Sequence, residues 1–313
     1  MAYEDASPNE LIQGVSENRV LLSSRIFSKK QNPEYLKIDQ KPRQSTPIKP
    51  FLKWPGGKRW LAECIKSIIN RKRFQRYFEP FLGGGALFFA LAPSDATISD
   101  INEELIVTYK QVRNQPARLI ARLREIPVDR DTYNKIRTQR PSSSLDRAVR
   151  FLYLNRTAFG GMYRVNHKGE FNVPFGGGQR TSAPLWEDGL LMAASEVLSN
   201  VNIICSDFKD IMQNRGEGDL VYCDPTYTVA HNNNGFIRYN EKNFSWEDQK
   251  VLAKAARKAA QRGATVIVSN AYTKDIKQLY KGARTLRLRR MSLVCPEATK
   301  RRLVTEYLFL YNI

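Results

Sequence analysis

The segment Asp224-Pro225-Thr226-Tyr227 follows the apolar run of residues 219–223, so it places a carboxylate, a peptide carbonyl and an aromatic ring at the end of a predicted strand. The exocyclic amine of a nucleobase is a poor nucleophile because its lone pair is delocalised into the ring. The Asp224 carboxylate and the Pro225 carbonyl can accept its two hydrogens and localise that lone pair for attack on an activated methyl group. Tyr227 offers a face on which an unstacked base can lie. An ordinary Asp-Pro turn at a strand end is the alternative.

A second segment, residues 77–89, joins an apolar strand to three consecutive glycines and then to a helix. Glycine has no Cβ, so the backbone at Gly83 and Gly85 can pass close to a ligand. Asp100 ends the next strand some 17 residues beyond Gly83, where a carboxylate can bind both hydroxyls of an adenosine ribose. A glycine-rich turn and a helix-capping aspartate are equally typical of these residues. The glycine spacing, and the lack of a following Gly-Lys-Ser/Thr, argue against a phosphate-binding P-loop.

A third segment, residues 51–58, places Trp54 between Lys53 and Lys58, with a Gly-Gly turn before the second lysine. An indole ring and an ammonium in this arrangement can bind a ligand that carries an aromatic base and a carboxylate. A buried tryptophan beside a loop is the alternative.

The charge of the chain indicates a polyanionic partner. Fifty Lys and Arg stand against 31 Asp and Glu, which gives a formal charge of +19. Residues 110–164 contain thirteen basic and four acidic side chains, and residues 284–302 contain seven and one. A solvated basic surface is the alternative for either stretch, but their positions beside the three segments favour a nucleic acid.

Short apolar runs rich in β-branched and aromatic residues alternate with helical stretches from Phe51 onward. This alternation predicts an α/β fold, a mainly parallel sheet with helices on both faces, and the last two runs predict a terminal antiparallel hairpin. Ser245 with Asp248 predicts a capped helix start, and Gly263 predicts the helix end. The predicted strands are residues 76–82, 96–100, 202–207, 219–224, 265–270, 284–288 and 305–311.

Residues 1–48 are polar, interrupted by proline and without sustained periodicity, so we expect a flexible extension before a domain over residues 49–313. Residues 110–200 break the alternation and predict a mainly helical insertion. The chain lacks an apolar run of the roughly 18 residues that a membrane helix needs. Its start fits neither a secretory signal nor a transit peptide, and we expect a cytoplasmic protein. The four cysteines lie far apart, which predicts free thiols and no metal site.

The segments FLKWPGGK, FEPFLGGG, ISDIN and DPTY, in this order, resemble the Dam-type (D12 class) adenine-specific DNA methyltransferases. The likeness continues through FLYLNR, MYRVN and KGEFNVPFG and covers about residues 49–313. It implies a Rossmann-like S-adenosylmethionine-dependent methyltransferase sheet with residues 110–200 as the target-recognition region. It also implies N6 methylation of an adenine flipped out of duplex DNA, at GATC or a related short site. A catalytically inactive DNA-binding relative and an RNA adenine methyltransferase are the alternatives.

The resemblance also implies roles for individual residues. Asp224, Pro225 and Tyr227 correspond to catalytic positions, and Tyr227 would stack on the base. Phe159 corresponds to an aromatic that wedges into the duplex. The expected DNA-binding residues are Lys53, Phe159 and Arg164, and the expected cofactor-binding residues are Trp54, Lys58, Glu79, Gly83, Gly85, Asp100 and Asp224.

Three positions depart from the family pattern. Thr226 stands where the family usually has a second proline, but it leaves the Pro225 carbonyl in place, so we expect activity to survive. Gly160 and Met162 stand where many members carry Asn and Leu. We expect a monomer that binds double-stranded DNA. The sequence leaves open whether it acts alone, beside a cognate restriction endonuclease, or within a phage or mobile element.

Overall fold

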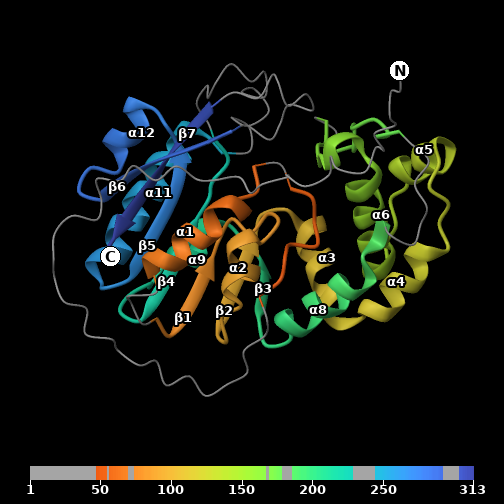
Figure 1. Cartoon of the computed structure of the whole chain (residues 1–313), viewed down its shortest axis with the longest axis horizontal. Helices are drawn as coiled ribbons and strands as arrows, with labels where there is room; N and C mark the ends of the chain where they lie inside the picture. Colours follow the sequence, from red (N-terminus) through yellow and green to blue (C-terminus); the bar gives the residue numbers. More distant parts are fainter. Residues whose placement is uncertain are drawn as a thin grey trace, which may run out of the picture.

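The computed structural model describes residues 47–54, 56–69, 74–166, 169–177, 185–227, 244–291 and 303–313. These residues contain a seven-stranded sheet in the order β3-β2-β1-β4-β5-β7-β6 (Figure 1). Neighbouring strands from β3 to β5 are parallel, whereas β7 is antiparallel to both β5 and β6. The strands are β1 Arg76–Glu79, β2 Ala96–Asp100, β3 Asn202–Cys205, β4 Asp219–Cys223, β5 Thr265–Ala271, β6 Arg284–Met291 and β7 Leu303–Tyr311.

The predicted α/β fold with a terminal antiparallel hairpin is confirmed, and each predicted strand is present. Three of them end earlier than predicted; β4 is one residue shorter, and β1 and β3 end for local reasons. β1 stops at Glu79 because Pro80 has no N–H to donate to a neighbouring strand. β3 stops at Cys205 because Asp207 already caps the next helix by accepting a hydrogen bond from Lys209 N.

Helices cover both faces of the sheet, and two apolar cores result. Successive strand residues point to opposite faces, so Tyr222 belongs to one core and its neighbours Val221 and Cys223 belong to the other. The first core is built with α1, α2, α3 and α8, and the second with α9, α11 and α12. The helices are α1 Arg59–Ile69, α2 Ala86–Leu91, α3 Glu103–Asn114, α4 Pro116–Arg124, α5 Arg130–Thr138, α6 Ser144–Thr157, α8 Asp188–Leu198, α9 Phe208–Met212, α11 Trp246–Gln261 and α12 Lys274–Leu279.

The helix that the sequence predicts from Ser245 is α11. Ser245 Oγ accepts a hydrogen bond from Asp248 N at 3.1 Å, and the Asp248 carboxylate accepts one from Ser245 N at 3.0 Å. This reciprocal capping box satisfies two amides that the first turn would otherwise leave without partners. Gly263, with φ of 98°, follows the last turn. Both predicted ends of the helix are confirmed.

A helical lobe lies beside the sheet, on the side of β3 (Figure 1). It consists of α4, α5, α6 and the 3-10 turn η2 Phe159–Gly161, which lie in the chain between α3 and α8. Helix α3 contacts β2 and β3 as well as α6, so it joins the lobe to the sheet. The predicted insertion begins at residue 110, which lies inside α3. That boundary, and a recognition role for residues 110–200, stay predictions.

Some expectations fall outside the part of the chain that the structure describes. Of the predicted flexible extension, only residues 47 and 48 are described. Cys64, Cys205 and Cys223 are free thiols, while Cys295 lies outside the described ranges. Within those ranges, no helix has the length and apolar character needed to cross a bilayer.

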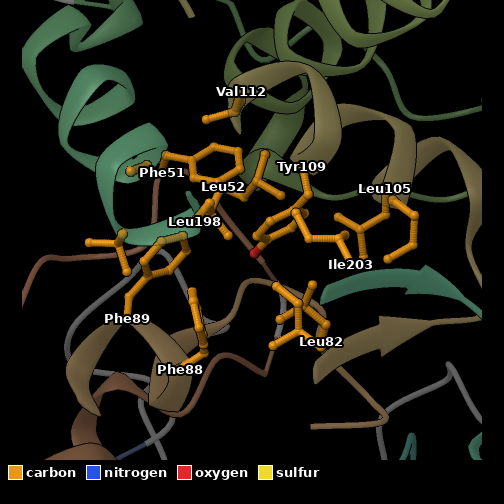
Figure 2. Packing of buried hydrophobic residues seen from close by; sticks show 14 of the residues in the cluster. Phe51, Leu52, Leu82, Phe88, Phe89, Leu105, Tyr109, Val112, Leu198 and Ile203 are labelled. Atoms are coloured by element: carbon orange, nitrogen blue, oxygen red, sulfur yellow. The ribbon is translucent and has the colours of Figure 1, made fainter. Parts of the chain in front are cut away.

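The segment of residues 51–54 joins the lobe to the sheet. Asn155 of α6 is fully buried; its Oδ1 accepts a hydrogen bond from Lys53 N at 3.0 Å, and its Nδ2 donates to Lys53 O at 2.7 Å. Figure 2 shows the Phe51 ring packed among side chains of α2 and α3, with its centroid 4.9 Å from that of Tyr109 and 5.8 Å from that of Phe89. The backbone of this segment is therefore fixed from both sides.

Asn155→Ala tests this clamp. The substitution removes both hydrogen bonds to the Lys53 backbone and a longer one from Asn155 Nδ2 to Gly161 O at 3.4 Å. We therefore expect the free energy of unfolding to fall by about 2 to 3 kcal/mol in a urea titration. Asn134→Ala, at an exposed position of α5, is the matched control and should change the free energy by less than about 0.5 kcal/mol. Equal stability of the two variants would contradict the clamp.

Candidate active site

Three carboxyl groups meet at the carboxyl ends of the parallel strands. Glu79 ends β1, Asp100 ends β2 and Asp224 follows β4. The strand order reverses between β1 and β4, and in doubly wound sheets ligands bind at the edge beside such a reversal. Three segments that are far apart in the sequence are thus brought to the place where this fold accepts a ligand.

The glycines after β1 form a tight loop against Trp54. Gly83 N donates a hydrogen bond to Asp100 Oδ2 at 3.0 Å, and Gly83 O accepts one from the Tyr109 hydroxyl at 3.1 Å. Gly83 has φ of +47°, and a Cβ there would lie 2.6 Å from Trp54 Nε1. Gly85 has φ of +65°, and its Cβ would lie 2.9 Å from the Tyr109 hydroxyl. Only glycine permits this approach of backbone and indole.

Asp100 lies next to the glycine loop and accepts the hydrogen bond from Gly83 N. Its second oxygen, Oδ1, accepts a hydrogen bond from Asn102 N at 3.0 Å. Burial raises the pKa of Asp100, while the N–H groups of Gly83 and Asn102 oppose that shift. The carboxylate is therefore oriented by two backbone amides beside a loop that lacks side chains, as expected for a residue that binds ribose hydroxyls.

A buried ammonium group lies at the centre of the site. Lys58 is 4% exposed, and its Nζ lies 3.3 Å from Asp224 Oδ1 and 3.0 Å from Glu306 Oε2. Nζ also donates a hydrogen bond to the Tyr227 hydroxyl at 2.9 Å. Burial disfavours the charged form of Lys58, but Asp224, Tyr227 and Glu306 outweigh that effect and raise its pKa. The ammonium therefore persists at neutral pH and fixes the positions of all three partners.

Asp224 combines burial with access to a ligand. Burial raises its pKa to about 6; the Lys58 ammonium opposes this rise, the charge of Glu306 adds to it, and a hydrogen bond from Ser269 lowers it. The carboxyl group is therefore mostly ionised at pH 7 and accepts hydrogen bonds. Its side chain is 21% exposed, so a base at this edge can reach it.

Two buried side-chain amides, those of Gln249 and Asn270, hold the turn after Asp224 by a chain of hydrogen bonds. Gln249 Nε2 of α11 donates to Thr226 O at 3.5 Å, and Gln249 Oε1 accepts from Asn270 Nδ2 of β5 at 2.9 Å. Pro225 is buried, whereas the Thr226 side chain is exposed. A threonine in place of the family's second proline therefore needs no space in the protein interior.

Glu306 belongs to this site although the sequence analysis did not predict it. It lies on β7, opposite Ala271 of β5, and is 1% exposed. One signal was present in the sequence, a single acid within the otherwise largely apolar run LVTEYLFLY. A charged side chain in a buried strand requires a partner of opposite charge. Its partner, Lys58, could not be identified without the strand order.

Glu79 is a second buried acid of the site, and it is 2% exposed. Burial raises its pKa to about 8, hydrogen bonds from the Tyr77 hydroxyl and Phe88 N oppose the shift, and the charges of Asp224 and Asp100 add to it. The Tyr77 hydroxyl donates to Glu79 Oε2 at 2.7 Å. Glu79 is thus largely protonated at pH 7, and a cation bound at this edge would favour its ionised form.

The predicted DNA-binding residues lie beside the glycine loop rather than within it. Phe159 is 50% exposed on the η2 turn. A Cβ on Gly161 of the same turn would lie 2.6 Å from Lys53 Cβ, so this turn packs directly on Lys53. Arg164 Nε donates to Asn172 Oδ1 at 2.8 Å on an exposed part of the lobe. The next residue after Lys53, Trp54, contacts the glycine loop, so the two groups of predicted residues are adjacent.

Gly160, one of the positions that depart from the family pattern, has φ of +63°. Glycine and asparagine are the residues that adopt this left-handed conformation most readily. The exchange between them is therefore explained by the backbone of the turn.

Comparisons with known proteins agree on one family. The sequence profile of the D12 class N6 adenine-specific DNA methyltransferases matches residues 54–293. A type II methyltransferase of Lactococcus lactis subsp. cremoris is 36% identical over 244 residues, which cover 75% of this chain and 85% of that protein. A type II methyltransferase of Methanocaldococcus jannaschii is 35% identical over 260 residues, covering 75% and 89%. The DNA adenine methylase of Escherichia coli K12 is 31% identical over 268 residues, covering 84% and 95%.

Glu79→Gln tests the protonation of the buried acid. Because the folded protein raises the pKa of Glu79 from 4.5 to about 8, it binds this proton more tightly than the unfolded chain. The stability that comes from this proton is complete below about pH 4.5 and is lost as the pH rises through about 8. We expect the wild type to lose up to about 1.4 kcal/mol per pH unit relative to Glu79→Gln between about pH 5 and 8.

The measurement is a series of urea titrations across that pH range, with Glu196→Gln, an exposed acid of α8, as the control. If the free energy of unfolding depends on pH in the same way in the wild type and in Glu79→Gln, Glu79 is already ionised at neutral pH.

Proposed function

The chain belongs to the D12 class N6 adenine-specific DNA methyltransferases, and we propose that it transfers a methyl group from S-adenosylmethionine to the N6 amino group of an adenine flipped out of duplex DNA. One observation carries the proposal. The Asp224 carboxylate is held by the Lys58 ammonium next to the Pro225 carbonyl, at the edge of the sheet that also carries the glycine loop. A base and a methyl donor can therefore meet at one place.

DNA adenine methylation is supported over the two alternatives by the family and its relatives. The matched family is described as acting on the N6 position of adenine in DNA. The curated relatives named above are a DNA adenine methylase and two type II methyltransferases. Neither an RNA methyltransferase nor an inactive DNA-binding relative is favoured by a residue of this site.

S-adenosylmethionine fits the chemistry of the residues at this edge. It carries a sulfonium and an ammonium, and Glu79, Asp100 and Asp224 are crowded acids whose pKa values are all raised, first by burial. Positive charge placed among them favours their ionised forms. When bound, the cofactor supplies an electrophilic methyl group. The proposed cofactor-binding residues are Trp54, Lys58, Glu79, Gly83, Gly85, Asp100 and Asp224.

The catalytic role of Asp224 follows from its ionisation. The Asp224 carboxylate and the Pro225 carbonyl accept the two hydrogens of the adenine amine and localise the nitrogen lone pair. Transfer of a methyl group to the amine would leave the nitrogen with a proton to lose. A carboxylate whose pKa is about 6 can accept that proton near neutral pH. Lys58 keeps this carboxylate oriented throughout.

Tyr227 is the proposed stacking partner of the flipped base. Its hydroxyl accepts the hydrogen bond from Lys58, and Lys58 Nζ lies 4.9 Å from its ring centroid. Anchoring the hydroxyl fixes one edge of the ring on which the base is proposed to stack. The ring and the Asp224 carboxylate are then positioned by the same ammonium.

The remaining roles concern the DNA. We propose that residues 110–200 form the target-recognition part of a domain over residues 49–313, with Phe159 as the wedge and Arg164 as the contact to a guanine. Lys53 approaches the duplex from the segment that α6 clamps. We propose a monomer that acts on a short site such as GATC. The two type II relatives make a cognate restriction endonuclease a reasonable partner to search for.

Asp224→Ala tests the function. Transfer of labelled methyl from S-adenosylmethionine to mixed-sequence duplex DNA should fall at least about 100-fold, because an acceptor that strengthens in the transition state is lost. DNA affinity, measured by fluorescence anisotropy, should stay within about twofold. Asp275→Ala, at an exposed position of α12, is the control and should keep full activity. An Asp224→Ala enzyme with near-wild-type transfer would refute the site, and a wild type that labels RNA but not DNA would refute the substrate.

Glu306→Gln tests the electrostatics around Asp224. Activity needs the Asp224 carboxylate, so kcat/KM of the wild type should fall as the pH drops through about 6. The charge of Glu306 raises the pKa of Asp224. Its removal should therefore shift the fall of kcat/KM at acidic pH to lower pH by about one unit.

The control is Glu63→Gln on α1, whose side chain is 80% exposed. Its pH profile should coincide with that of the wild type. If the acidic fall of kcat/KM in Glu306→Gln occurs at the wild-type pH, or at a higher pH, Glu306 does not raise the pKa of Asp224.

A further inference from the structure

The hairpin of β6 and β7 extends beyond the catalytic edge of the sheet. β5 ends at Ala271, which pairs with Glu306, whereas β6 and β7 continue through the pairs Arg289–Thr305, Arg290–Val304 and Met291–Leu303. Three further residues at about 3.4 Å each make an overhang of roughly 10 Å. β6 runs in the same direction as β5 because both are antiparallel to β7. Its carboxyl end therefore projects on the side of the sheet edge where Asp224 lies.

Exposed positive charge lies at the start of this projecting part, on Arg289, and just before it, on Arg287, which pairs with Tyr307. Arg287 and Arg289 are both exposed, and because they are two residues apart on a strand they lie on the same face. The guanidinium of Arg287 lies 5.2 Å from the ring centroid of Tyr272, which is 37% exposed at the end of β5. Within the described part of the chain, neither arginine forms an ion pair. No acid of the described residues therefore neutralises their charge.

The two arginines and the helical lobe lie at opposite ends of the strand order. The lobe lies beside β3 at one end of the strand order, and β6 is at the other end (Figure 1). β6 is three strand positions from β4, roughly 14 Å at about 4.8 Å per step. A duplex is about 20 Å wide, so DNA placed with its target base at Asp224 and the lobe on one side has its backbone within reach of the hairpin on the other.

We propose that Tyr272, Arg287 and Arg289 form a second DNA-contacting surface, the basic hairpin face, which binds the phosphate backbone on the side of the flipped adenine opposite the lobe. Guanidinium groups bind phosphate oxygens through charge-assisted hydrogen bonds. Such contacts add affinity without reading sequence. The basic hairpin face holds the duplex against the catalytic edge while the lobe selects the site.

The double variant Arg287→Gln/Arg289→Gln tests this surface, since glutamine keeps most of the packing of each side chain and removes its charge. We expect the Kd for a fluorescein-labelled duplex to rise about tenfold at roughly 0.1 M salt. The slope of log K against log salt should become shallower by about two, close to one for each lost phosphate contact. The effect should be equal on target-containing and target-free duplexes. KM for DNA should rise, and turnover should recover at saturating DNA.

The matched control is Arg284→Gln, an exposed arginine at the opposite end of β6, where it pairs with Leu310. It should retain the wild-type Kd and salt slope. The single variant Arg289→Gln, at the projecting tip, provides a second test if the double variant has a lowered Tm, and should change the slope by about one.

Three results would overturn the proposal. The first is a double variant whose Kd and salt slope equal those of Arg284→Gln. The second is a loss of affinity confined to the target duplex, which would indicate base contacts. The third is a lower turnover at saturating DNA with unchanged Kd, which would place the effect on the catalytic edge. The binding measurements need no methyl transfer, so they stand apart from the tests of Asp224.

Discussion

One buried ammonium determines how the site is assembled. Removing Lys58 from water costs several kcal/mol unless partners of opposite charge and good geometry surround it. Those partners come from two other parts of the chain, the turn after β4 and the inserted strand β7. Folding must therefore bring the segment before α1, the end of β4 and β7 together. The same requirement fixes the carboxylate of Asp224 and the ring of Tyr227, so the stability of the fold and the proposed catalysis depend on one set of contacts.

The sequence was sufficient to predict the sheet and most of the site, because both leave local patterns. Apolar runs marked the strands, Ser245 and Asp248 marked the start of α11, and the glycines with Asp224 marked the ligand edge. Glu306 was missed because its role depends on which strands are neighbours, and β7 lies between β5 and β6 rather than after them. The clamp of Asn155 on Lys53 was missed for the same reason, since it joins residues that are 102 positions apart.

Burial disfavours the ionised forms of the three acids at the edge of the sheet. Glu79, Asp100 and Asp224 all have raised pKa values, and Lys58 is engaged with Asp224 and Glu306 rather than with the other two. A fold usually avoids such crowding, because charged groups buried without enough partners reduce stability. Its presence at a topological switch point supports the proposed binding of a cationic methyl donor.

Lys53 and Trp54 are joined by a single peptide bond, yet Lys53 packs against the η2 turn and Trp54 packs against the glycine loop. Asn155 holds that peptide from the side of the lobe. In the proposed function the duplex contacts Lys53 and the methyl donor contacts Trp54, so a displacement of the segment by one substrate would change the binding of the other. Thermodynamic linkage makes such coupling reciprocal, so whatever factor the nucleic acid contributes to retention of the methyl donor, the donor contributes to retention of the nucleic acid.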